Sequence, residues 1–89
     1  MSINIPEELR RLIEEITMNK LSSVKGKTET LSFVDSVIEE LKKRGINLSD
    51  DQEAMARPYV VDILWSLRKR GVITMDDDLL HFSVMKQES

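Results

Sequence analysis

The spacing of apolar residues changes at Gly71, and this change constrains the possible folds more than any other feature. Before it, apolar residues recur every three or four positions, the period of amphipathic helices. After it, apolar and polar residues alternate in two short segments, 72–75 and 79–84, separated by three aspartates at 76–78. We therefore expect an α+β fold, mainly α, with helices first and a C-terminal two-stranded β-hairpin over 72–84.

Two amphipathic helices are predicted in the first half of the chain. One spans about 6–20 and opens at Pro6, because proline suits the first helical position. Its apolar stripe is Ile5, Leu9, Leu12, Ile13 and Ile16. The other spans about 30–44 and ends at Gly45, which supplies the left-handed residue of a helix cap. Its stripe is Leu31, Val34, Val37, Ile38 and Leu41. The polar, lysine-rich stretch between them is predicted to be a basic loop over 21–29.

A proline separates the next two predicted helices. Ser49 followed by Gln52 is a capping-box signal that opens a short helix over 49–56. Pro58 disfavours helical geometry at the residue before it, so we expect the helix to break there. A longer helix over 58–70 follows, and the two helices predict a helix-turn-helix arrangement.

The end of the longer helix resembles the winged helix-turn-helix superfamily, in which a recognition helix ends in a basic turn, a glycine and the first wing strand. The residues that carry this resemblance are Ile63-Leu64-Trp65-Ser66-Leu67-Arg68-Lys69-Arg70-Gly71-Val72-Ile73. The resemblance covers 30–84 and implies a winged-helix-like bundle of about four helices with the C-terminal hairpin. DNA-binding members place the longer helix in the major groove and the wing against the backbone or minor groove.

The charges of this chain fit DNA binding poorly. It has 13 basic and 16 acidic residues and a net charge of −3, whereas nucleic-acid-binding proteins usually carry a basic surplus. The predicted wing tip at 76–78 is acidic, so phosphates would repel it. A DNA-binding transcriptional regulator that uses helix 58–70 and hairpin 72–84 is therefore the second hypothesis. Its contact residues would be Lys25, Lys27, Arg57, Tyr59, Ser66, Lys69 and Arg70.

Trp65 is either a core side chain or part of a protein interface, and the interface belongs to the first hypothesis for function. With Val61, it lies beside the core stripe of the helix over 58–70 and widens its apolar arc. Either the first helix covers this flank or a partner does, and tryptophan is enriched at interfaces. The chain is thus predicted to be a small non-enzymatic regulatory or protein-interaction module, whose partner is another protein or a second copy in a homodimer. The interface would comprise Leu9, Ile13, Ile16, Val61 and Trp65.

The chain shows no residue set suited to catalysis or metal binding. It lacks cysteine, which excludes disulfides, thiolate catalysis and cysteine zinc sites. Gly26-Lys27-Thr28 matches the end of a phosphate-binding loop but lacks that motif's first glycine, and a flexible basic loop is the alternative. His81 is the single histidine, and the aspartates 76–78 lack the spacing of a calcium loop. We expect no enzyme activity, no metal, no cofactor and no small-molecule substrate.

The length of the chain and its lack of long apolar segments predict its domain organisation and location. The 89 residues fit one domain, with a helical arm at 6–20, a basic loop at 21–29, a core at 30–84 and a frayed tail at 85–89. We find neither a secretory leader nor an apolar run of about 18 residues, so membranes are not expected partners and a cytoplasmic location is expected.

An internal echo relates two parts of the chain at an offset of 26 residues. Segment 34–46 matches segment 60–72 in its apolar spacing and in its run of three basic residues before a glycine. The echo indicates either a duplicated unit or two amphipathic helices that end by the same rules.

Overall fold

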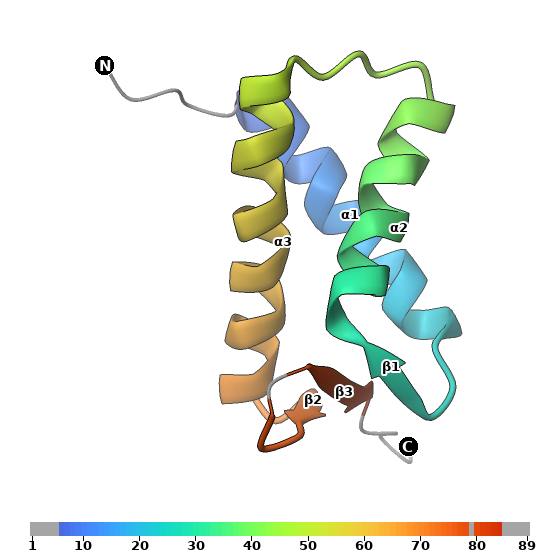
Figure 1. Cartoon of the computed structure of the whole chain (residues 1–89), viewed down its shortest axis with the longest axis vertical. Coiled ribbons are helices and arrows are strands. Elements are labelled where there is room, and N and C mark those ends of the chain that lie inside the picture. Colours follow the sequence, from blue (N-terminus) through green and yellow to red (C-terminus); the bar gives the residue numbers. More distant parts are fainter. Residues whose placement is uncertain (1–5, 79, 85–89) are drawn as a thin grey trace.

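The computed structural model describes residues 6–78 and 80–84, in which three helices pack together above a small antiparallel sheet (Figure 1). The elements are α1 (Glu7–Ser23), β1 (Lys27–Glu29), α2 (Thr30–Lys43), α3 (Asp50–Lys69), β2 (Ile73–Met75) and β3 (His81–Val84). The α+β, mainly helical class is as predicted. No helix within these ranges is long and apolar enough to cross a membrane. Ile5, Leu79 and the tail predicted to fray at 85–89 lie outside the described residues.

The helices predicted over 6–20 and 30–44 form as α1 and α2. The cap of α2 follows the prediction: Gly45 adopts a φ of 84°, its N–H donates to the Lys42 carbonyl at 3.0 Å, and the Ile46 N–H donates to that of Leu41 at 3.1 Å. Leu31 departs from the predicted stripe, because it is 63% exposed while the other four stripe residues of α2 are buried.

The break predicted at Pro58 is wrong. The helices predicted over 49–56 and 58–70 are one helix, α3, with Pro58 inside it. The predicted capping box does open the helix, since each of Ser49 and Gln52 accepts the other's backbone N–H through its side chain. Proline removes one helical hydrogen bond, but Ala56 and Val60 on either side of it are fully buried. Burial of this face therefore outweighs the local preference of proline.

The hairpin predicted over 72–84 forms as β2 and β3, but it is part of a three-stranded sheet. The third strand, β1, lies within the segment predicted to be a basic loop over 21–29. It pairs with one edge of β3, with Thr28 opposite Phe82, and β2 pairs with the other edge in the order β1-β3-β2. The sequence did not predict β1, because three residues are too few to show an alternating pattern. Its pairing with β3 helps to stabilise a hairpin that would be marginal by itself.

A single cluster of buried residues joins the helices to the sheet. Phe82 of β3 packs edge to face on Phe33 of α2, with ring centroids 5.3 Å apart and an interplanar angle of 87°. Ile13 of α1, Leu41 of α2 and Leu64 of α3 are each fully buried in the same core. This packing holds α2 and α3 side by side and fixes the surface between them.

Candidate functional site

The structure divides the five predicted interface residues into two groups. Leu9, Ile13 and Ile16 of α1 face the core and are 9%, 0% and 1% exposed. Val61 and Trp65 of α3 are only partly buried. The stripe of α1 is thus used for packing within the chain, and in this conformation only the two residues of α3 are accessible to a partner.

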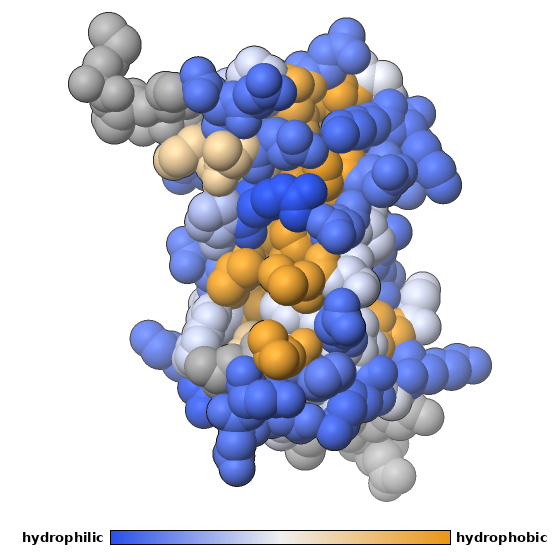
Figure 2. Space-filling view, viewed as in Figure 1, coloured by the Kyte–Doolittle hydropathy of each residue, from blue (hydrophilic) through white to orange (hydrophobic). Residues whose placement is uncertain are grey.

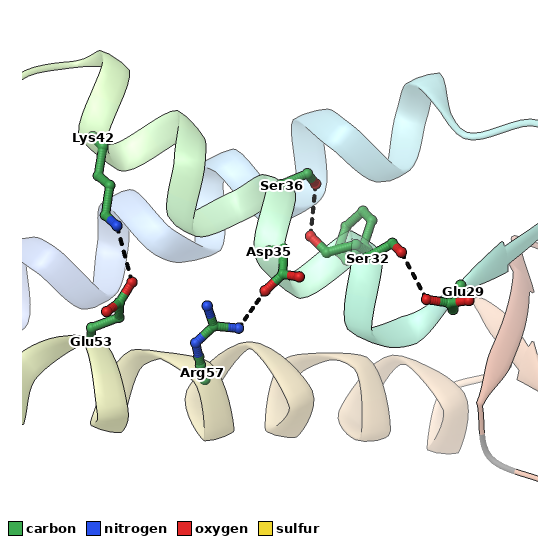
Figure 3. Close-up of polar contacts among 8 residues, drawn as sticks. Glu29, Ser32, Asp35, Ser36, Lys42, Glu53 and Arg57 are labelled. Atoms are coloured by element: carbon green, nitrogen blue, oxygen red, sulfur yellow. Dashed lines mark hydrogen bonds and ion pairs between the residues drawn. The ribbon is translucent and has the colours of Figure 1, made fainter. Parts of the chain in front are cut away.

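Two ion pairs close one half of the seam between α2 and α3 (Figure 3). Lys42 Nζ lies 3.2 Å from Glu53 Oε1, and further along the seam Arg57 binds Asp35. From the first pair to the second, the residue number decreases on α2 and increases on α3, so the two helices run antiparallel. Partly exposed pairs of this kind contribute little stability, and their main effect here is to fix the register of the helices.

The other half of the same seam carries apolar side chains. Leu31 lies one turn before Asp35 on α2 and Val61 lies one turn after Arg57 on α3, so both continue the seam toward the sheet. Leu80 lies at the start of α2, since its carbonyl accepts the N–H of Thr30, which is next to Leu31 in the chain, at 2.8 Å. Leu31 and Leu80 are 63% and 52% exposed. Figure 2 shows hydrophobic side chains gathered on this face over the seam.

Trp65 extends this apolar half by one further turn of α3. Within the described residues, Tyr59 and Val61 pack as partly buried side chains against the core cluster, but Trp65 does not. The guanidinium carbon of Arg68 lies 5.0 Å from the centre of its ring, a cation–π contact that shields one face of the indole. We call the four apolar residues together the seam surface: Leu31, Val61, Trp65 and Leu80.

Three of the seven residues predicted to contact nucleic acid are engaged by acidic side chains. Arg57 belongs to the seam ion pair, and Lys27 Nζ lies 2.6 Å from Asp76 Oδ2. The Tyr59 hydroxyl donates to Glu14 at 3.0 Å, and burial together with this bond raises the pKa of Tyr59. The remaining four are exposed: Lys25, Ser66, Lys69 and Arg70. Fewer cations are therefore available to phosphates than the sequence indicates.

The acidic turn between β2 and β3 already uses its charges within the chain. One ligand atom from each of Asp76, Asp78 and His81 lies within 4.8 Å of the others, a spacing that a metal ion would fit. However, Lys27 contacts Asp76, so an ammonium group opposes a second cation there. The backbone N–H of Leu80 donates to Asp78 at 2.9 Å, and this bond lowers the pKa of the Asp78 carboxyl.

The phosphate-loop interpretation of Gly26-Lys27-Thr28 does not fit the structure. Lys27 and Thr28 lie in β1 and pair with β3, whereas the motif places its lysine and hydroxyl residue at the start of a helix.

A groove of about 550 Å³ lies between α1 and α2 and was not predicted, because its walls come from separate segments. Several of its polar groups are engaged within the chain. Ser36 Oγ donates to the Phe33 carbonyl at 2.7 Å, and Ser32 Oγ donates to Glu29 at 2.8 Å (Figure 3). Arg44 is paired with a glutamate one turn earlier. The seam surface is therefore the stronger candidate site.

No family model, no curated protein and no solved structure matches this chain. The basis for a function is therefore the chemistry of the surface itself.

Proposed function

We propose that the chain is a non-enzymatic protein-interaction module on a winged-helix-like fold, and that a partner protein binds the seam surface. One observation carries this proposal: Leu31 and Leu80 are heavily exposed, Trp65 is only partly buried, and hydrophobic side chains gather on this face of the molecule (Figure 2). Scattered exposed apolar residues are normal, but a contiguous apolar patch bordered by charges is typical of interaction sites. The centre of such sites is enriched in tryptophan.

The polar half of the seam supports the same proposal. Asp35 and Arg57 close the seam where they face each other, and one turn further on α2 and α3 carry Leu31 and Val61. This change from charged to apolar side chains is expected where a second protein covers the half of the seam nearer the sheet.

The proposal is tested with a displayed library of amphipathic helical peptides, selected for binding to the chain. We expect Leu31→Asp to weaken the binding of the selected helices to the chain at least tenfold, because the substitution places a charge in the apolar contact. Met18→Asp is the matched control, since Met18 is 46% exposed on α1, away from the seam surface. Fluorescence anisotropy measures both. Equal binding by the two variants would contradict the proposal.

A titration with random duplex DNA separates this function from DNA binding. We expect a dissociation constant no better than micromolar at physiological salt, because Arg57 and Lys27 are neutralised and the turn between β2 and β3 is acidic. Nanomolar, sequence-dependent binding that falls steeply with salt would instead establish a DNA-binding regulator.

A further inference from the structure

The outer face of α3 carries an apolar stripe with opposite charges on one flank. Pro58, Val61 and Trp65 form the stripe. Asp62 and Lys69 lie on the same flank of it, because seven residues are nearly two helical turns. Trp65 lies between these two charges along the helix axis. The acidic group thus comes one turn before the indole and the basic group one turn after it.

These two charges have no ion-pair partner within the described part of the chain, in contrast to Glu53 and Arg57 on the flank that faces α2. They are both exposed. Asp62 and Lys69 do not pair with each other, because a seven-residue separation is a rise of roughly 10 Å. The flank therefore presents one free negative and one free positive charge at matched distances from Trp65.

We propose that the protein bound at this surface is a second copy of the chain, with the two α3 helices packed antiparallel about Trp65. This inference rests on the proposed function and names its partner. A two-fold axis through the contact makes the α3 helices of the two copies antiparallel. A group one turn before Trp65 in one copy therefore lies opposite a group one turn after Trp65 in the other. Asp62 of each copy then lies opposite Lys69 of the other, and the pair forms twice. The two indoles lie near the axis, next to Val61 of each copy.

The limited extent of the surface indicates a weak dimer. A stable interface buries about 800 Å² per partner, whereas one face of a single helix of about 30 Å with its neighbouring leucines offers less. We expect a dissociation constant in the micromolar range. The charge pairs select the antiparallel arrangement, and Trp65 and Val61 supply the apolar burial.

Charge reversal tests the proposal. Asp62→Lys and Lys69→Asp each place like charges opposite each other twice, so sedimentation equilibrium is expected to show dimerisation weakened at least tenfold for either variant alone. An equimolar mixture of the two restores both pairs and is expected to recover the unmodified affinity. The double variant Asp62→Lys/Lys69→Asp is expected to behave in the same way. Asp77→Lys is the matched control, an exposed reversal in the turn between β2 and β3.

The outcomes separate this inference from the proposed function. Circular dichroism confirms folding, which these exposed positions are expected to preserve. A strict monomer at several hundred micromolar unmodified protein overturns the inference, while displayed helices that still require Leu31 would keep the proposed function. A dimer that the single reversals leave unchanged, or that mixing does not restore, also overturns the antiparallel arrangement. Failure of both the dimer and the displayed helices overturns the proposed function itself.

Discussion

Replacing Pro58 with alanine is expected to stabilise the protein. Pro58 is the ninth of the twenty residues of α3, and its ring nitrogen has no hydrogen to donate to the carbonyl of Ala54, one turn earlier. Both residues are exposed, so the substitution removes little buried apolar surface. Pro58→Ala adds the missing hydrogen bond and removes the contact of the ring with the preceding turn.

The expected gain follows from two opposing terms. Proline is about 3 kcal/mol less favourable than alanine inside a helix. Proline also restricts the unfolded chain, which offsets about 0.4–1 kcal/mol of that difference. The net gain in the free energy of unfolding is about 2 kcal/mol. For a domain of this size the midpoint of thermal unfolding rises by about 4–8 °C per kcal/mol, so we expect an increase of roughly 10 °C.

Urea unfolding followed by circular dichroism measures this gain. Ser66→Ala is the matched control, because Ser66 is also exposed on α3 and gains only helix propensity, about 0.5 kcal/mol. A gain for Pro58→Ala no larger than the control would refute the reasoning. A lower free energy of unfolding for Pro58→Ala would mean that the packing of the fully buried Ala56 and Val60 depends on a bend that the proline imposes.

Two further predictions concern single polar groups. Thr17 of α1 is fully buried and its hydroxyl has no hydrogen-bond partner among the residues that the structure describes, so Thr17→Val is expected to raise the free energy of unfolding by about 1 kcal/mol. If urea unfolding gives a lower free energy of unfolding for Thr17→Val than for the unmodified protein, the Thr17 hydroxyl does form a hydrogen bond in the folded protein. The lowered pKa of Asp78 means that its carboxylate stabilises the fold above the unfolded value of 3.8, and that this contribution is lost as pH falls through the lower folded pKa. Asp78→Asn should therefore destabilise the protein at neutral pH but not in strong acid. An NMR titration of the Asp78 carboxyl with a midpoint at or above 3.8 would contradict this.

Local signals predicted α2 and its cap because every determinant lies within the segment. The apolar period, the basic last turn and Gly45 act over a few residues, and the hydrogen bonds of the cap formed as expected. The start of α3 was predictable for the same reason, from Ser49 and Gln52. The errors concern features that depend on distant partners. Burial against the rest of the core keeps α3 helical through Pro58, and pairing with β3 makes a strand of 27–29.

The candidate site was predictable only in part. Val61 and Trp65 were identified from their position beside the core stripe of their own helix, which requires no knowledge of the partner helix. Leu31 was assigned to the core stripe of α2, although it lies at the edge of that stripe and its exposure depends on the register against α3. Leu80 joins the surface through a backbone bond to the start of α2, a contact that the sequence does not encode locally.

The internal echo reflects how the two helices end. Gly71 repeats the cap of Gly45: its φ is 79°, its N–H donates to the Arg68 carbonyl at 3.1 Å, and the next N–H donates to Leu67 at 2.9 Å. The likeness stops after the caps. The aspartates at 50 and 51 begin a helix, whereas their counterparts at 76 and 77 lie beside or within a turn between strands. Shared rules for ending an amphipathic helix explain the echo without a duplicated unit.

The same alignment also bears on the seam surface. Both helices bury corresponding residues, so positions at the same offset have the same orientation relative to the core. Where α2 exposes Asp35 and Glu39, α3 carries Val61 and Trp65 at the corresponding positions. Val61 packs against the core cluster, but among the described residues Trp65 does not, so the core does not account for the indole. The proposed contact with a partner protein would bury the accessible part of the indole, and burial of an indole is favourable.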